Sequence, residues 1–203
     1  MKTPKDNIVP TRIVACGVFK PVLYELHILD SHPELDVRFL PAKLHLNPVQ
    51  IEKLLRTELC AALDSGHRPI CLYGECFPGI DDLCNSFGAQ RARGCHCYEM
   101  LLGSKRFRAL MKETAGTFFI ERELLNDFER SCIQTLELHD EEIRRCLFAH
   151  YRKVVYVRQP SDIDLLERAD EVARFLELSL EVMDADYSDF EKELIRLILF
   201  GKQ

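Results

Sequence analysis

Short apolar runs alternate with helical patterns along the chain. The first three runs, at 12–16, 35–40 and 69–73, each end at a loop that begins with glycine or proline. The run at 69–73 is continuously apolar, which is typical of a strand buried on both faces of a parallel sheet. Between the second and third runs, apolar residues recur at helical spacing over 48–64. Strand, loop and helix therefore follow one another from the start of the chain.

The same alternation continues to the end of the chain. We predict further strands at 90–92, 117–120, 154–157 and 180–183. Helices are predicted at 21–29, 48–64, 81–87, 98–102, 105–112, 122–135, 140–152, 162–176 and 189–200, with Ser161 as the N-cap of the helix at 162–176. Successive strand-loop-helix units indicate right-handed βαβ crossovers and a parallel sheet.

The sequence therefore predicts the α/β class, as a Rossmann-like three-layer domain with a mainly parallel sheet and helices on both faces. No repeat, linker or low-complexity stretch interrupts the pattern. We accordingly expect residues 1–203 to form a single domain.

The charge pattern argues against nucleic acid as a partner. Hydrophobic residues make up 47% of the chain and charged residues 30%, as in soluble globular proteins. The formal net charge is -6, and Lys and Arg are scattered rather than gathered into a stripe that could neutralise phosphates. No apolar run approaches the ~20 residues of a spanning helix, so we expect no membrane partner either.

Nine cysteines point to a reducing compartment. Residues 1–10 lack the apolar core of a signal peptide, and a cytosol rarely keeps structural disulfides. The odd number of cysteines agrees with free thiols. We therefore expect a cytoplasmic protein whose thiols serve in burial, metal binding or catalysis.

Three of these cysteines stand at or just after the carboxyl ends of predicted strands. They are Cys16, Cys76 and Cys97. Neighbouring parallel strands are ~4.8 Å apart, and ligands of open parallel sheets bind outside these strand ends, so distant thiols can meet there. Thiolates bind zinc, Cu(I) and iron–sulfur clusters, and three protein ligands with an open position are typical of catalytic zinc. The sequence thus predicts a metal site made by these three thiols, with His45 or water completing the coordination.

Core packing is the alternative role for each thiol, because cysteine also behaves as a small hydrophobic residue in tight loops. Cys95 and His96 stand too close to Cys97 for all three to bind one ion easily. In an extended segment Cys95 and Cys97 share a side, whereas at a helix start Cys97 alone turns inward. The remaining cysteines stand among apolar helix or strand positions and are predicted to pack in the core: Cys60, Cys71, Cys84, Cys132 and Cys146.

Four further residues are candidates for chemistry at this edge of the sheet. His45 could be a metal ligand, a proton carrier or a loop cap. Glu75, beside Cys76, could act as a general base, with a solvated carboxylate as the alternative. Gly17 and Gly74 could let the backbone approach a bound cofactor, with turn formation as the alternative. A nucleotide site is not indicated, because neither Gly-x-Gly-x-x-Gly nor a Walker loop is present.

Several of these residues lie in short segments with a common spacing: Ala15-Cys16-Gly17, Leu44-His45, Tyr73-Gly74-Glu75-Cys76 and the segment from Cys97 to Gly103. Together these segments resemble an uncharacterised prokaryotic family of α/β proteins, the domain of unknown function 1638. The resemblance maps the family's cysteines onto Cys16, Cys76 and Cys97, and its Leu-His pair onto His45. Some members lie beside corrinoid-dependent methyltransferases, which implies a link to one-carbon metabolism and a corrinoid-related protein as a partner.

Three functions are open at this point. The first is a metal-dependent enzyme or metal-binding protein, in which zinc holds a thiol of a small-molecule substrate as thiolate and methyl transfer to sulfur follows. The second is an iron–sulfur protein of electron transfer. The third is a non-catalytic module that binds a small molecule or a protein, with cysteines filling a crevice.

Overall fold

The strands of the chain form two sheets, and every strand pairing in both sheets is parallel. The computed structural model describes residues 10–162 and 164–199. The first sheet has the order β2-β1-β3-β4 and consists of β1 (Thr11–Cys16), β2 (Leu35–Leu40), β3 (Arg68–Leu72) and β4 (Gln90–Arg91). The second sheet has the order β5-β6-β7 and consists of β5 (Thr117–Ile120), β6 (Lys153–Arg158) and β7 (Ser179–Asp184). The predicted α/β class is confirmed, although the strands are divided between two sheets instead of forming one.

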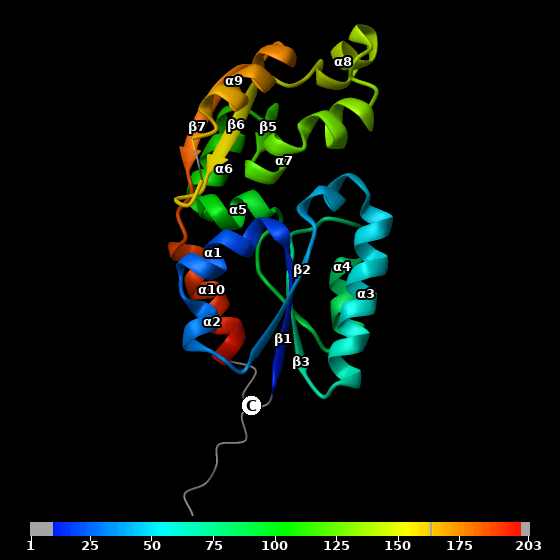
Figure 1. The fold of residues 1–203 in the computed structure, drawn as a ribbon, viewed down its shortest axis with the longest axis vertical. Helices are drawn as coiled ribbons and strands as arrows, with labels where there is room; N and C mark the ends of the chain where they lie inside the picture. The colour runs from blue at the N-terminus through cyan, green and yellow to red at the C-terminus, as the bar shows by residue number, and fades with distance from the viewer. Residues whose placement is uncertain (1–9, 163, 200–203) are drawn as a thin grey trace, which may run out of the picture.

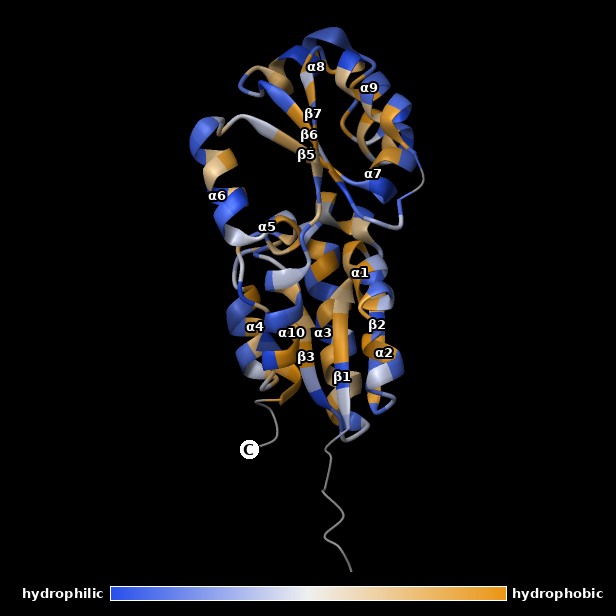
Figure 2. Cartoon of the chain, turned by 90° about the vertical axis from the view of Figure 1, so that its left-hand side faces the viewer, coloured by the Kyte–Doolittle hydropathy of each residue, from blue (hydrophilic) through white to orange (hydrophobic). Residues whose placement is uncertain are grey.

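Helices cover both faces of the first sheet, which gives it the predicted three layers. Figure 1 shows α3 (Pro48–Asp64) and α4 (Ile80–Ser86) on one face, with α1 (Lys20–Glu25), α2 (Ile28–Ser31) and α10 (Ser188–Leu199) on the other. The second sheet has α7 (Arg122–Asn126) and α9 (Leu166–Phe175) on one side and α6 (Ser104–Glu113) on the other (Figure 2). The remaining helical segments are α5 (Cys97–Leu102), α8 (Glu141–Phe148), the 3-10 helices η1 (Gly17–Phe19) and η2 (Ala42–Leu46), and the π-helix η3 (Glu129–Gln134). Within the described chain, no helix has the length and apolarity that crossing a bilayer requires.

The carboxyl ends of the two sheets face each other (Figure 1). The chain passes from the first sheet to the second through α5 and α6, and after β7 it returns in α10 to the first sheet. One hydrophobic cluster extends from Ile13 and Val14 in β1 to Val155 and Val157 in β6. The two sheets therefore share a continuous apolar core beside the space between their ends, and a single domain over 1–203 stays our prediction.

The last helix is fixed to the first sheet by ring stacking and by hydrogen bonds. Phe190 of α10 stacks on the fully buried Phe19, with 5.1 Å between ring centroids. Arg68, at the start of β3, donates hydrogen bonds to the carbonyl oxygens of Leu197 and Ile198 at 3.1 and 3.2 Å. Carbonyl groups in the last turn of a helix have no partner within the helix, so this guanidinium satisfies two of them.

Two predicted helices are interrupted. The helix expected at 21–29 is split into α1 and α2 at His27, whose φ of 50° is left-handed. The helix expected at 122–135 ends at Asn126, and the π-helix Glu129–Gln134 follows it. The helix expected at 189–200 is found as α10 up to Leu199, and residue 200 lies outside the described residues.

The helix expected at 162–176 begins later than predicted, at Leu166. The prediction of Ser161 as its N-cap is therefore wrong. Asp162 is drawn away from a helical role because it accepts hydrogen bonds from Arg122, from the Tyr156 hydroxyl and from the Gln159 amide. The Ser161 hydroxyl accepts a hydrogen bond from Arg122 instead of capping a helix.

Replacing Phe190 by alanine tests the docking of the last helix. Phe190 is 4% exposed, so the substitution removes buried ring area and the stack on Phe19. We expect Phe190→Ala to lower the free energy of unfolding by about 3–5 kcal/mol in chemical denaturation. Tyr24→Ala on α1, where the side chain is 55% exposed, is the matched control and should cost well under half as much. Equal losses in the two variants would contradict this packing.

Candidate functional site

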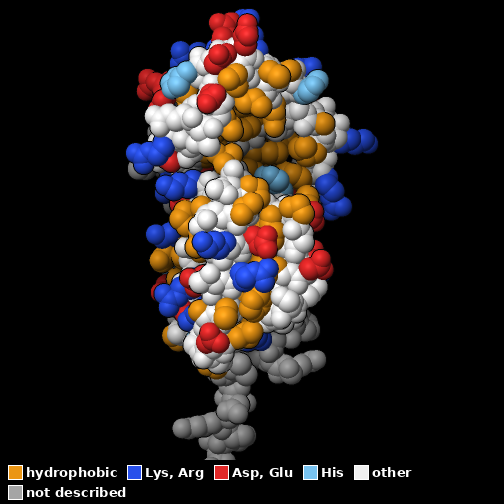
Figure 3. Space-filling view, turned by 90° about the vertical axis from the view of Figure 1, so that its right-hand side faces the viewer, with side chains coloured by type: hydrophobic (Ala, Val, Ile, Leu, Met, Phe, Trp, Pro, Cys, Tyr) orange, Lys and Arg blue, Asp and Glu red, His pale blue; other side chains and the backbone are white. Residues whose placement is uncertain are grey.

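A cavity of about 380 Å³ lies between the carboxyl ends of the two sheets. Figure 3 shows the corresponding hollow midway along the molecule, surrounded by hydrophobic side chains. The first sheet contributes residues at or just after the ends of its strands, among them Cys16, the last residue of β1, and Tyr73 and Cys76 in the loop after β3. The second sheet contributes Phe118, Phe119 and other residues of β5 and the position after it. The volume falls in the range of small-molecule sites.

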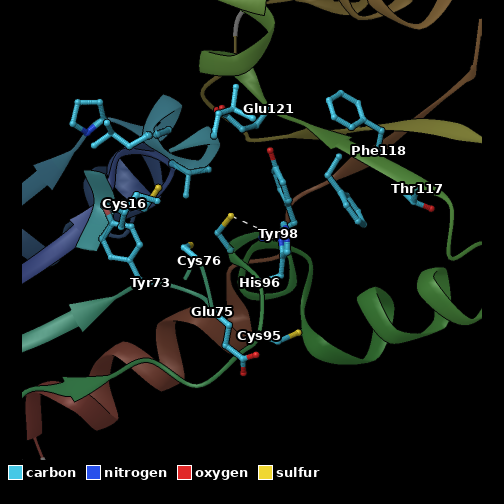
Figure 4. Close-up of a pocket in the computed structure, with 18 of the residues that line it drawn as sticks. Cys16, Tyr73, Glu75, Cys76, Cys95, His96, Tyr98, Thr117, Phe118 and Glu121 are labelled. Carbon is cyan, nitrogen blue, oxygen red and sulfur yellow. Dashed lines mark hydrogen bonds between the residues drawn. The ribbon is translucent and has the colours of Figure 1, made fainter. Parts of the chain in front are cut away.

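The structure brings the three predicted thiols to this one cavity. Cys16 is 8% exposed, and Cys76 and Cys97 are half-buried. All three line the cavity, although they come from segments far apart in the sequence. In Figure 4 Cys16 and Cys76 lie on one side of the cavity, while Phe118 and Glu121 lie on the other. The thiols thus form one wall, which we call the thiol wall, and their role as metal ligands stays a prediction.

The loops that carry Cys76 and Cys97 touch through their backbones. The amide of Glu75 donates a hydrogen bond to the carbonyl oxygen of Cys95 at 2.9 Å. A Cβ on Gly74 would lie 2.9 Å from the same oxygen and 3.1 Å from the amide nitrogen of Cys97. Such distances are closer than van der Waals contact allows, so only glycine at position 74 lets the loops approach this far. The separation of Cys76 and Cys97 depends on this contact.

Arg91 of β4 holds the same two loops by hydrogen bonds. Its guanidinium donates to the carbonyl oxygens of Tyr73 and Gly94 at 3.0 and 3.1 Å. The carboxylate of Asp81, which pairs with Arg91 at 2.6 Å, fixes the guanidinium in turn. Because the planar guanidinium has several donors in fixed directions, one side chain positions both loops.

Gly17 has a comparable steric reason for lacking a side chain. A Cβ there would lie 3.1 Å from the amide nitrogen of Ala42 and 3.2 Å from the carbonyl oxygen of Leu40. The end of β1 therefore packs directly against the start of η2, the 3-10 helix that contains His45. Cofactor binding by Gly17 and Gly74 stays a prediction. The side chain of His45 lies outside the described part of the structure.

The three thiols of the thiol wall are neutral at physiological pH. The pKa of Cys16 is raised to about 12, mainly by burial. A hydrogen bond from the backbone amide of Val18 lowers the pKa, whereas the nearby Cys76 and Glu121 raise it. Burial also raises the pKa of Cys97, with Cys16 and Cys76 adding to the effect. The pKa of Cys76 is raised by burial, although the backbone at Gly74 and the charge of Arg91 oppose the rise. Each thiol therefore needs a nearby positive charge to become a thiolate.

Glu121 is a buried carboxyl group on the opposite side of the cavity. It is 3% exposed and directly follows β5. Its two oxygens accept the amides of Glu123 and Leu124 at 2.9 Å each, which caps α7. Burial nevertheless raises the pKa of Glu121 to about 7, with a further rise from Glu123 and Asp162. Glu121 therefore titrates near neutral pH.

Aromatic rings form the cavity wall beyond the thiols. This aromatic wall consists of Tyr98, Phe118, Phe119 and Tyr151. Tyr98 and Phe119 stack with 5.1 Å between ring centroids, and Phe118 meets Tyr151 edge-on at 5.8 Å. These contacts hold the rings against one another, so the wall is apolar and preformed.

Cys95 and His96, the two residues before Cys97, make contacts of their own. The Cys95 sulfur donates to a carboxylate oxygen of Glu99 at 3.0 Å, and Figure 4 shows it turned away from Cys16. The His96 ring stacks on Tyr98, and its Nδ1 accepts the amide of Tyr98 at 3.3 Å and lies 3.9 Å from the Cys97 sulfur. Glu75 is exposed at the rim of the cavity, and its role as a general base stays a prediction.

Among the residues that the structure describes, no group of three or more His, Cys, Asp and Glu side chains stands in the arrangement of a metal site.

Three of the other cysteines are packed in the core as predicted: Cys71, Cys84 and Cys132. Cys60 and Cys146 are exposed instead, because they stand on the outer faces of α3 and α8.

Glu121 and the aromatic wall are functional-site residues that the sequence pattern did not predict. Glu121 stands at the carboxyl end of a predicted strand, which is the same signal that pointed to Cys16 and Cys76. This signal identified only one side of the cavity, because the sequence pattern does not reveal a second sheet whose strand ends face those of the first. Tyr73 was noted as part of a motif but was given no role.

The fold and the cavity define an α/β protein with a cysteine-lined cavity between two parallel sheets. A family model described as protein of unknown function (DUF1638) matches residues 39–194, and the chain belongs to this family. The resemblance seen in the motifs is thereby confirmed. The matched range contains His45, Glu75, Cys76 and Cys97 and begins after Cys16. No curated protein and no solved structure matches the chain.

Replacing Gly74 by alanine tests the contact between the two loops. The new methyl group would meet backbone atoms of Cys95 and Cys97, which cannot rotate away. We expect Gly74→Ala to lower the free energy of unfolding by about 1–3 kcal/mol and to speed the reaction of Cys76 and Cys97 with a thiol reagent. Gly79→Ala in the same loop is the control, because a Cβ there meets open space and only its φ of 83° is strained. Unchanged thiol reactivity in Gly74→Ala would contradict the contact.

The pH dependence of stability tests the burial of Glu121. A folded pKa of about 7, raised from 4.5, means that its contribution to stability is full below pH 4.5 and is lost as pH rises towards 7. At about 1.4 kcal/mol per pKa unit, the loss is on the order of 3 kcal/mol. We expect chelator-treated Glu121→Gln to lack this fall in denaturation curves between pH 4 and 8. Glu142→Gln on α8, at an exposed position away from the cavity, is the control and should keep the wild-type profile; the same profile in Glu121→Gln would contradict the assignment.

Proposed function

We propose that this protein binds a small molecule next to a thiophilic metal ion, with zinc as the first candidate, held by Cys16, Cys76 and Cys97. The observation that carries the proposal is the meeting of these three thiols on one cavity of small-molecule size. Thiolate sulfur is the donor that zinc, Cu(I) and iron–sulfur clusters have in common. Three protein ligands leave a coordination position free, which is the arrangement of catalytic rather than structural zinc.

The charge of the cavity supports the same proposal. The lining includes the carboxyl groups of Glu75 and Glu121, and none of the described lining residues is Lys or Arg. Burial raises the pKa of all three thiols, and the backbone amides and the charge of Arg91, which lies outside the lining, oppose this rise only in part. A metal cation supplies positive charge and displaces the thiol protons, so we expect affinity to rise with pH.

Each part of the chain has a defined task in this proposal. Zinc, when bound, supplies a Lewis acid that keeps a substrate thiol as thiolate. The thiol wall holds the ion, and the aromatic wall excludes water and contacts the apolar part of the substrate. Glu121, with a pKa of about 7, can hold or release a proton at neutral pH. His45 or water is our proposed fourth ligand, without a described geometry.

The setting that we propose is one-carbon metabolism, with methyl transfer to sulfur as the reaction and a corrinoid-related protein as a partner. It follows from the family resemblance together with the thiol chemistry described above. A cytoplasmic location is part of the same proposal, because thiols of this kind persist in a reducing compartment.

Metal analysis of anaerobically purified protein tests the proposal. We expect about one metal ion per wild-type chain, as zinc, and in Cys76→Ser a drop in affinity of at least roughly tenfold, since even outer-shell partners of a metal are worth that much. Measurement is by elemental analysis and by competition with a metal indicator.

Cys60→Ser is the matched control, because Cys60 is exposed on α3 and does not line the cavity. It should keep the wild-type metal content. Equal metal content in wild type and Cys76→Ser would contradict the proposed ligand set. If the wild-type protein is brown and its visible absorption is lost in Cys76→Ser, the bound group is an iron–sulfur cluster and not zinc.

A further inference from the structure

Tyr73 carries a buried hydroxyl group that has no hydrogen-bond partner in the described part of the chain. Its side chain lines the cavity and is 2% exposed. The hydroxyl oxygen has no hydrogen-bond partner among the residues that the structure describes. Tyr156 and Tyr187 differ in this respect, because their hydroxyls donate to Asp162 and Gln159 at 2.9 Å each.

An unpaired buried hydroxyl costs free energy, because it has lost its hydrogen bonds to water and gained none. Tyrosine is not required there for its volume alone, since phenylalanine fills nearly the same space. A partner from outside the described protein, either a ligand or a water molecule, would remove this cost. A ligand in the cavity is the natural partner, because the side chain forms part of the cavity wall.

The position of Tyr73 fixes which part of the ligand it would contact. Figure 4 shows its ring beside Cys16, within the thiol wall. A phenol keeps its proton at neutral pH and can donate a hydrogen bond, as the hydroxyls of Tyr156 and Tyr187 do. The ligand therefore has a hydrogen-bond acceptor at its thiol-facing end.

The rest of the cavity limits the charge of the ligand. The aromatic wall offers apolar ring faces, and Glu121 stands beside it. No Lys or Arg is found among the described residues that line the cavity, so a phosphate or carboxylate would find no counter-charge there. In the metal-free cavity an anionic ligand is disfavoured on this ground.

We infer that Tyr73 is a ligand-binding residue, which donates a hydrogen bond to an acceptor atom of a small molecule that is uncharged apart from any sulfur held by the metal, and whose apolar part lies against the aromatic wall. This inference deepens the proposed function and rests on its small-molecule part. It does not depend on the identity of the metal.

Three probes of similar shape test the inference: benzamide, which is uncharged and has an acceptor; benzoate, which is anionic; and toluene, which has no acceptor. We expect chelator-treated wild type to bind benzamide more tightly than benzoate and toluene in titrations followed by NMR. Tyr73→Phe should raise the Kd of benzamide by roughly fivefold to tenfold and leave that of toluene unchanged.

Tyr156→Phe is the matched control. Its ring is fully buried and its hydroxyl is bonded, but it does not line the cavity. We expect Tyr156→Phe to keep benzamide binding and to lower the melting temperature. Tyr73→Phe should melt at or above the wild-type temperature without ligand, because it removes an unpaired hydroxyl.

The inference is overturned by equal benzamide binding in wild type and Tyr73→Phe, by benzoate binding as tight as that of benzamide, or by no benzamide binding in wild type. The metal content of Tyr73→Phe should equal that of wild type. The metal content of Cys76→Ser therefore tests the metal proposal, whereas the binding of the three probes tests this inference.

Discussion

The cavity depends on the backbone contact between Gly74 and the loop at 95–97. β3 and β4 pair over only two positions, Ile70 with Gln90 and Cys71 with Arg91, so the sheet itself does little to fix the loops that follow. The hydrogen bond from the Glu75 amide to the Cys95 carbonyl continues the pairing beyond the strand ends. Because this contact excludes even a methyl group, it sets how far apart the two loops lie.

The polar groups in the cavity walls have no Lys or Arg beside them among the described lining residues. The walls of the cavity contain the three members of the thiol wall, whose pKa values are raised, a carboxyl group whose pKa is about 7, and a phenol that has no hydrogen-bond partner among the described residues. Each of these groups is partly or fully removed from water, and no Lys or Arg among the described lining residues offsets their desolvation. An apolar filling of the same space would be more stable. Such local violations of good packing are expected where a sequence serves binding rather than stability.

The sequence predicted the elements well and their assembly in part. The apolar run at 69–73 and the spacing of Leu55 and Leu59 report strand and helix directly, because burial follows the local period. The break at His27 depends on one left-handed residue, and the late start at Leu166 depends on Asp162 binding Arg122 and Tyr156. Partners distant in the sequence decide such features, so no local pattern reveals them.

The candidate site shows the same division between local and distant information. Strand ends placed Cys16, Cys76 and Cys97 on one wall, because parallel strands share a carboxyl edge. Glu121 and the aromatic wall belong to another sheet, and their position opposite the thiols follows from the orientation of that sheet. A ligand in the cavity therefore contacts both sheets at once. Its affinity depends on the distance between the sheets, which the shared hydrophobic cluster from β1 to β6 fixes.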